Sequence, residues 1–167
     1  INENLIEQSI FDRPFNRSYN RTPFIPNDFH DIDGIFSIQS LGLIKRLTHI
    51  GCDKVVIGIS GGLDSTLALL VCIRAFDAMG IDRKGIIGIT MPCFGTTKRT
   101  LNNSKELMEC LGITSYEIDI TKAVEQHFKD IDHDPNNADI TFENCQARER
   151  TQILMDMANK HNAIVIG

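Results

Sequence analysis

The sequence has no long apolar run and no excess of positive charge. None of its apolar segments approaches the length of a transmembrane helix, and its first residues lack the charged-then-apolar pattern of a signal peptide. The formal net charge is −5, so the basic surface that is typical of nucleic-acid-binding proteins is absent. We therefore expect a soluble protein whose partners include neither a membrane nor a nucleic acid.

Paired cysteines are missing as well. The five cysteines form no C-x-x-C pair and leave an odd count: Cys52, Cys72, Cys93, Cys110 and Cys145. This pattern favours reduced thiols in a cytoplasmic protein over a disulfide framework. Cys93, beside Pro92, is the only one whose exposure matters for reactivity, and we do not expect a catalytic thiol.

Two common nucleotide-binding fingerprints are absent from the stretch 54–66, where a run of β-branched residues meets a turn of small residues and then an apolar segment. A dinucleotide fingerprint counted from Gly58 would require glycine where Ser60 and Leu63 stand. A Walker A loop would require a lysine, and none follows these glycines before the helix begins. The stretch therefore predicts neither a nicotinamide-cofactor dehydrogenase nor a kinase or GTPase.

The turn itself predicts a phosphate-binding loop between a strand and a helix. Ser60, Gly61 and Gly62 let backbone N–H groups at the start of the helix point at an anion, which the helix dipole also favours. Asp64 and Ser65 lie in the first helical turn, where they suit magnesium–nucleotide chemistry but could also cap the helix. The alternative, a purely structural turn, is disfavoured because capping alone would not require both residues beside Ser60.

Strand and helix patterns alternate along the rest of the chain. Residues 1–30, with three prolines and three arginines, predict a linker, and residues 32–49 predict an amphipathic helix. The further predicted strands are 85–91, 116–120 and 164–167; the further predicted helices are 63–79 (apolar almost all round, hence buried), 100–111, 121–131 and 141–161, the last with Thr141 as N-cap. This alternation predicts an α/β fold with a parallel sheet covered on both faces, and a ligand site beyond the carboxyl ends of its strands.

A second candidate site is the segment Gln146-Ala147-Arg148-Glu149-Arg150 near the start of the last predicted helix. Arg148 and Arg150 point to different sides of a helix, so one could face a ligand while the other forms a salt bridge. Two cations near a helix N-terminus oppose its dipole, which suggests an outside anion. The alternative is a solvated charged face with Glu149 as the local counter-ion.

Three segments together resemble the synthetase domain of NAD synthetases, most closely the glutamine-dependent branch. They are 60–65, 91–97 (Met-Pro-x-Phe-Gly-Thr-Thr) and 143–151, and the resemblance covers roughly residues 30–167. The first motif is shared with the wider ATP pyrophosphatase family, which includes GMP synthetase and tRNA-thiolating enzymes, whereas the Gln-Ala-Arg-x-Arg segment is more discriminating. The resemblance implies a Rossmann-like, three-layer parallel sheet with helices on both faces, of the adenine nucleotide alpha hydrolase type.

In that family the carboxylate of nicotinic acid adenine dinucleotide is adenylated by ATP and then attacked by ammonia to give NAD+. The resemblance implies ATP and Mg²⁺ as cofactors, ammonia that is either free or derived from glutamine, and a homodimer. It assigns Arg148 to the dinucleotide, Asp64 to Mg²⁺, and Asp64 and Ser65 to catalysis. The implied ATP-binding residues are Gly58, Ser60, Gly61, Gly62, Asp64, Ser65 and Thr97.

The resemblance also predicts the boundaries of the chain. Residues 31–167 are expected to be an ATP pyrophosphatase domain that is incomplete at its C-terminus, and residues 1–30 the linker from a missing N-terminal domain. The family continues beyond Gly167 with a Gly-Thr-Gly stretch and an acidic residue of the site, so we expect the chain by itself to fold but to make no NAD+. The rival functions are another ATP pyrophosphatase, of the GMP synthetase or tRNA-thiolating type, and a non-catalytic ATP-binding module.

Overall fold

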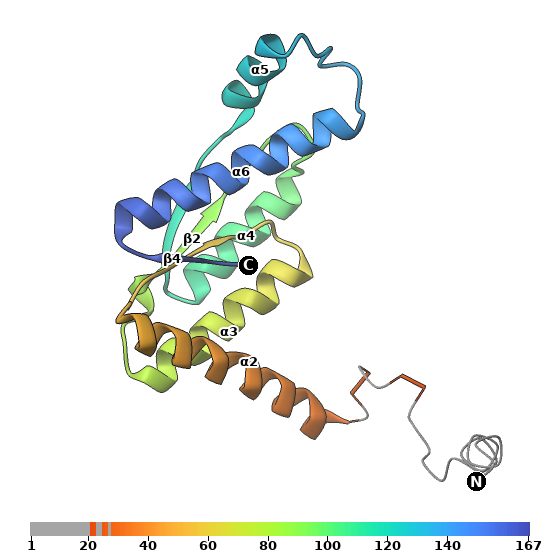
Figure 1. Cartoon of the computed structure of the whole chain (residues 1–167). Coiled ribbons are helices and arrows are strands. Elements are labelled where there is room, and N and C mark those ends of the chain that lie inside the picture. The colour runs from red at the N-terminus through yellow and green to blue at the C-terminus, as the bar shows by residue number, and fades with distance from the viewer. Residues whose placement is uncertain (1–20, 23–24, 27) are drawn as a thin grey trace, which may run out of the picture. The chain divides into compact units, whose positions relative to one another are not determined.

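A parallel sheet of four strands organises the fold (Figure 1). Its strand order is β3 (Thr114–Glu117), β2 (Ile86–Thr90), β1 (Val55–Gly58) and β4 (Ile164–Ile166). The computed structural model describes residues 21–22, 25–26 and 28–167. The elements are α2 (Phe29–Ile50), β1 (Val55–Gly58), α3 (Leu63–Met79), the 3-10 turn η1 (Arg83–Gly85), β2 (Ile86–Thr90), α4 (Lys98–Cys110), β3 (Thr114–Glu117), α5 (Thr121–Asp130), α6 (Ile140–His161) and β4 (Ile164–Ile166). Residues 36–167, which contain the whole sheet, make up one compact unit.

All strand pairs in the sheet are parallel, as predicted. Val55 of β1 lies opposite Ile86 of β2 and Ile164 of β4, and Ile87 of β2 lies opposite Thr114 of β3. Because the strands run in the same direction, their carboxyl ends meet at one edge of the sheet, where α/β proteins bind their ligands.

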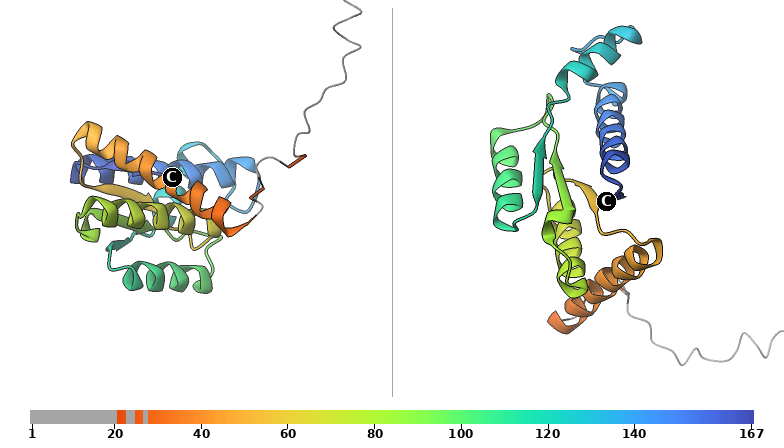
Figure 2. Two further views of the ribbon diagram at one scale, coloured as in Figure 1. Left: turned by 90° about the horizontal axis from the view of Figure 1, so that it is seen from below. Right: turned by 90° about the vertical axis from the view of Figure 1, so that its left-hand side faces the viewer.

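Helices cover both faces of the sheet (Figure 2), and each face has its own apolar core. Val55 and Ile57 of β1 point to one face, where they pack with residues of α3, α4 and the C-terminal part of α2. Val56 points to the other face, where it packs with residues of α5 and α6. The predicted α/β fold with three layers is therefore confirmed.

The boundaries of β3 and α4 differ from the sequence prediction for identifiable reasons. β3 spans Thr114–Glu117 rather than 116–120, because it is an edge strand whose residues are mostly exposed and carry no apolar signal. α4 begins at Lys98, two residues early, because Thr97 caps it: the Thr97 hydroxyl oxygen accepts a hydrogen bond from the N–H of Thr100 at 3.2 Å.

The helix α3 is exposed along one side. Leu63, Leu67 and Leu70 are 87, 49 and 38% exposed and share a helix face, whereas Leu69 and Phe76 on the other side are fully buried. The prediction of a buried helix is therefore right for the side that faces the sheet and wrong for the other side, because an apolar sequence does not reveal which neighbours are present. Among residues 21–22, 25–26 and 28–167, no helix combines the length and apolar character needed to cross a bilayer.

Much of the predicted linker 1–30 lies outside the described residues, namely 1–20, 23–24 and 27. The helix predicted for 32–49 begins at Phe29 and ends at Ile50, so it includes the last residues that the linker prediction covered. Asp28 accepts a hydrogen bond from the N–H of Asp31 at 2.9 Å, which satisfies a donor of the first turn. The linker role itself remains a prediction.

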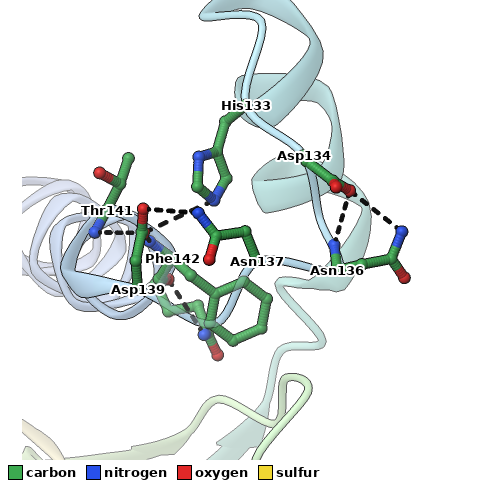
Figure 3. A network of polar contacts seen from close by, with 8 residues as sticks. His133, Asp134, Asn136, Asn137, Asp139, Thr141 and Phe142 are labelled. Atoms are coloured by element: carbon green, nitrogen blue, oxygen red, sulfur yellow. Dashed lines mark hydrogen bonds and ion pairs between the residues drawn. The ribbon is translucent and has the colours of Figure 1, made fainter.

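The N-cap of α6 is Asp139, not the predicted Thr141 (Figure 3). The Asp139 carboxylate accepts hydrogen bonds from the N–H groups of Thr141 at 2.8 Å and Phe142 at 3.0 Å. Asn137 donates to the same carboxylate at 3.0 Å, and His133 Nε2 lies 3.7 Å from it. The hydrogen bond from Phe142, followed by the other donors, lowers the pKa of Asp139 below its ordinary value of 3.8.

We predict that Asp139→Ala lowers the free energy of unfolding at neutral pH, because two N–H groups in the first turn of α6 lose their acceptor. Folding lowers the pKa of this carboxyl. Its stabilising effect is therefore complete above about pH 3.8 and is lost as the pH falls through the lowered pKa of the folded state. Urea unfolding should therefore show a difference between wild type and variant that shrinks on acidification.

Asp134→Ala is the matched control, because the Asp134 carboxylate accepts hydrogen bonds from Asn136 in the preceding loop rather than from α6. It should cost less stability than Asp139→Ala at neutral pH. An equal loss in both variants, or an Asp139→Ala effect that does not change with pH, would contradict the capping role.

Candidate active site

A cavity of about 610 Å³ opens at the carboxyl ends of β1 and β2. It is bounded by the residues that follow each strand, by the first turn of α4 and by one side of α6. The lining residues are Gly58, Ile59, Ser60, Ile89, Thr90, Met91, Gly95, Thr96, Thr100, Glu143, Gln146, Arg150 and Leu154. Ser60 and Met91 lie at this edge as predicted for a ligand site, whereas Gly167 is not among the lining residues.

The loop Ser60–Ser65 leads from β1 into α3, and its shape depends on Gly61. The φ angle of Gly61 is +82°, in the left-handed region. A Cβ atom there would lie 2.6 Å from the carbonyl oxygen of Thr100 and 3.0 Å from the hydroxyl oxygen of Ser104. A side chain fits neither the backbone conformation nor the space, so glycine is what brings the loop this close to α4.

The first turn of α3 has no side-chain cap. Gly62 is the N-cap residue, and no side chain accepts a cap hydrogen bond from the helix. The Ser65 hydroxyl instead donates to the Gly62 carbonyl at 3.1 Å and lies 3.1 Å from the Ser60 hydroxyl, while Asp64 is exposed. The alternative in which Asp64 and Ser65 serve as caps is therefore wrong, and N–H groups at the start of α3 are available to an anion.

One side of α6 faces the cavity with Glu143, Gln146, Arg150 and Leu154, which follow the helical period. Of the two candidate arginines, Arg150 lines the cavity, whereas Arg148 is exposed and is not among the lining residues. The argument from the helix dipole does not hold for either, because both lie beyond the first turn of a helix that begins at residue 140. The assignment of Arg148 to the dinucleotide remains a prediction.

Arg150 and Leu154 bring α6 against the ends of the strands. Arg150 Nε donates to the carbonyl oxygen of Met91 at 3.5 Å. A Cβ atom on Gly58 would lie 3.2 Å from Leu154 Cδ1 and 3.6 Å from Met91 Cε. The missing side chain of Gly58 therefore lets α6 approach the end of β1 closely.

An aromatic cluster holds the loop after β2 next to α5 and α6. The ring centroids of Phe94 and Phe142 are 5.4 Å apart, those of Phe128 and Phe142 are 5.4 Å apart, and those of Phe94 and Phe128 are 6.2 Å apart. The N–H of Cys93 donates to the Thr96 hydroxyl at 3.0 Å, which closes the loop on itself. Phe94 therefore has a packing role in the segment 91–97, although 43% of its surface stays exposed.

Sequence reasoning missed several cavity residues. Thr97, predicted to lie near ATP, is not among the lining residues, whereas its neighbours Thr96 and Thr100 are. The contact of Thr97 with ATP therefore remains a prediction. Gln146, only 6% exposed, and Arg150 belong to the second candidate segment, but the sequence assigns a ligand to neither of them, although the helical period of α6 puts them on one face.

The acidic groups available for a metal ion are few. Glu143 lines the cavity, and Asp64 is exposed in the first turn of α3. In the described part of the chain, no three or more His, Cys, Asp or Glu side chains gather to hold a metal ion. Mg²⁺ needs only one or two carboxylates where phosphate oxygens supply further ligands, so Asp64 fits the predicted role alongside a bound nucleotide.

A thiol nucleophile is not available at this site. Cys93 is buried, and burial raises the pKa of its thiol, which disfavours the reactive thiolate. All five cysteines are unpaired. The lining residues of the cavity therefore offer positioning and charge, and no cysteine is among them.

The residues that form the sheet and the cavity match a known family model. This model is that of NAD synthase, and it covers residues 36–167. The chain belongs to the NAD synthase family. The family and the fold predicted from the sequence are thereby confirmed, and the assignment to another ATP pyrophosphatase is not favoured.

The curated relatives of this chain include NAD(+) synthetases of two kinds, glutamine-dependent and NH(3)-dependent. The glutamine-dependent NAD(+) synthetase of Mycobacterium leprae is 43% identical over 159 residues, which are 90% of this chain and 23% of the relative. The NH(3)-dependent NAD(+) synthetase of Fusobacterium nucleatum is 36% identical over 125 residues, 75% of this chain and 45% of the relative. The chain thus spans about a quarter to a half of the length of these relatives.

Solved structures agree with this family assignment. The glutamine-dependent NAD+ synthetase of Acinetobacter baumannii, in complex with ADP, superposes with a TM-score of 0.70 at 26% identity, over 78% of this chain and 24% of that one. The NH3-dependent NAD synthetase of Campylobacter jejuni superposes with a TM-score of 0.68 at 23% identity, over 80% of this chain and 54% of that one. The second likeness shows the fold alone.

We predict that Gly61→Ala lowers the free energy of unfolding by at least about 1–2 kcal/mol, the typical cost of a left-handed conformation for a residue with a side chain. The close approach to the Thr100 carbonyl adds to this cost. Gly95→Ala is the control, since a Cβ there meets no atom within 4 Å and its φ is not in the left-handed region. Chemical denaturation should separate the two variants, and similar stabilities would contradict the account of the loop.

Proposed function

We propose that this chain is the ATP-binding region of an NAD synthetase, a ligase that converts nicotinic acid adenine dinucleotide to NAD+ with ATP and ammonia. The observation that carries the proposal is the loop Ser60–Ser65, which leaves the start of α3 uncapped beside the cavity. Membership of the NAD synthase family supports the choice of substrates. Because relatives of both kinds are named, the proposal leaves open whether the ammonia is free or comes from glutamine.

In this proposal ATP binds with its phosphates at the loop. The N–H groups and dipole of α3 attract the phosphates. The hydroxyl groups of Ser60 and Ser65, which bond to each other in this structure while Ser65 also bonds to the Gly62 carbonyl, rotate to donate to the phosphates when the nucleotide binds. The small size of Gly61 and Gly62 gives the phosphates access to the backbone. The ADP in the structure of the Acinetobacter baumannii relative supports an adenine nucleotide as ligand. Mg²⁺, held by Asp64, neutralises phosphate charge when it is bound.

In the proposed reaction no substrate forms a covalent bond with the protein. A carboxylate oxygen of the dinucleotide attacks the α-phosphorus of ATP, and the bond to pyrophosphate breaks. Ammonia then attacks the activated acyl carbon, AMP leaves, and a proton is released. Such a displacement needs the reactants in line and the phosphate charge balanced, which the loop supplies and Arg148 assists by binding the dinucleotide.

We extend the proposal to the organisation of the protein. Residues 31–167 act as the ATP pyrophosphatase domain and residues 1–30 as a linker, and the start of the family match at residue 36 supports this division. The protein acts as a cytoplasmic homodimer. Five unpaired cysteines suit a reducing compartment, and the dimer rests on the family resemblance.

The proposed function is tested by incubating the full-length protein with nicotinic acid adenine dinucleotide, ATP, Mg²⁺ and ammonium. Mass spectrometry should detect NAD+, AMP and pyrophosphate in equal amounts. Reactions that lack ATP or the dinucleotide are the controls. Formation of ADP and phosphate, or amidation of a different acid only, would contradict the proposal.

We predict that Asp64→Asn lowers turnover about 100-fold or more while the free energy of unfolding changes little. The loss has the size expected when one electrostatic contact to a transition state is removed, and an amide cannot balance phosphate charge through Mg²⁺ as a carboxylate does. Asp156→Asn, at an exposed position of α6, is the matched control. Unchanged turnover of Asp64→Asn at saturating Mg²⁺ would remove Asp64 from the site.

We predict that Arg148→Ala weakens binding of nicotinic acid adenine dinucleotide by about 10- to 100-fold and leaves ATP affinity nearly unchanged. A hydrogen bond between charged groups contributes about 1.5–3 kcal/mol, which corresponds to this range. Titration of each ligand into the variant measures both effects. A loss of ATP affinity with normal dinucleotide binding would reverse the assignment.

A further inference from the structure

We infer that Arg150 binds a phosphate group of ATP in the cavity and is oriented for this contact by the carbonyl of Met91. The inference rests on the proposed function, because it takes ATP as the ligand. It adds to the site a residue that lies far along the chain from the loop Ser60–Ser65.

The first observation is the place of Arg150 in the fold. It comes from α6 on one face of the sheet, whereas α3 lies on the other face (Figure 2). Both Arg150 and Ser60 line the cavity at the carboxyl ends of β1 and β2. A nucleotide whose phosphates meet the N-terminus of α3 therefore extends towards a cation on the opposite wall.

The second observation is that Arg150 lacks a charged partner. It is half-buried, and no carboxylate of the described residues forms an ion pair with it. Glu143, on the same side of α6, lines the cavity, and none of the ion pairs between described residues joins it to Arg150. A partly buried cation is costly unless an anion balances it, so the cavity favours an anionic ligand at this point.

The third observation is the orientation of the guanidinium group. Its Nε donates to the Met91 carbonyl at 3.5 Å, which engages one of its five N–H donors. The two terminal nitrogens remain as a planar fork, which suits the oxygens of a phosphate group. Because Leu154 holds α6 close to Gly58, the helix that carries this fork is fixed against the sheet.

A neutral base or ribose would not balance the positive charge of Arg150. The dinucleotide is already assigned to Arg148, which is not among the residues that line the cavity. The phosphates of ATP are therefore the ligand that the arrangement favours. The alternative anion in the reaction is the pyrophosphate of nicotinic acid adenine dinucleotide, and the test below separates the two.

The test is isothermal titration of the full-length protein with ATP, adenosine and nicotinic acid adenine dinucleotide. Arg150→Met should weaken ATP binding about 10- to 100-fold, the range expected for a lost hydrogen bond between charged groups, and leave adenosine binding within about twofold. Its ATP affinity should also depend less on ionic strength than that of wild type. The ATP affinity of Arg150→Lys, which keeps the charge without the planar fork, should lie between that of wild type and that of Arg150→Met. Arg46→Met, at an exposed arginine of α2, controls for the substitution itself.

The possible results distinguish a phosphate contact of Arg150 from other roles. Equal losses for ATP and adenosine would mean that Arg150 only shapes the cavity, and a loss confined to the dinucleotide would mean that it serves the other substrate; either result overturns the inference. Unchanged ATP binding by Arg150→Met overturns the inference as well, whatever the result for Arg150→Lys. If wild type itself does not bind ATP, the proposed function fails and the inference falls with it, whereas normal binding by wild type leaves the proposed function standing.

Discussion

The site depends on a backbone contact that only glycine permits. Gly61 adopts a left-handed conformation with its Cα pressed towards the carbonyl oxygen of Thr100, at a spacing that excludes a side chain. The position of this carbonyl is set in turn by the start of α4, where Thr97 caps the first turn. With the loop drawn against α4, Ser60 comes to the cavity wall and α3 begins without a side-chain cap. The donors at the start of that helix are thereby kept for a ligand.

The second half of the site is supplied by α6, and three features place this helix. Asp139 caps its first turn, Phe142 joins an aromatic cluster with Phe94 of the loop after β2, and Leu154 lies close to Gly58 at the end of β1. None of these three contacts needs a ligand. The cavity is consequently formed by packing of the chain itself, which suits a reaction that depends on holding two substrates in line.

The sequence predicts the sheet and the turn between β1 and α3 well because strong local signals mark them. β1 and β2 are buried on both faces and therefore read as continuous apolar runs, whereas the edge strand β3 carries no such signal and was placed two residues late. The cap of α6 was misassigned because Asp139 and Thr141 are both good N-cap residues, and only the backbone geometry distinguishes them. Likewise, the sequence located both arginines of α6 but could not decide which of them faces the cavity, since that depends on how the helix is rotated on the sheet.

The central claim is that ATP is split between its α and β phosphates at the cavity beside Ser60–Ser65, with the dinucleotide carboxylate as the attacking group. It is tested most directly by exchange of labelled pyrophosphate into ATP by the full-length protein in the absence of ammonia and glutamine. The account predicts that label enters ATP only when nicotinic acid adenine dinucleotide is present, because pyrophosphate release is reversible until ammonia consumes the adenylate. Exchange that is independent of the dinucleotide, or no exchange by a protein that nevertheless makes NAD+ when ammonia is added, would contradict it.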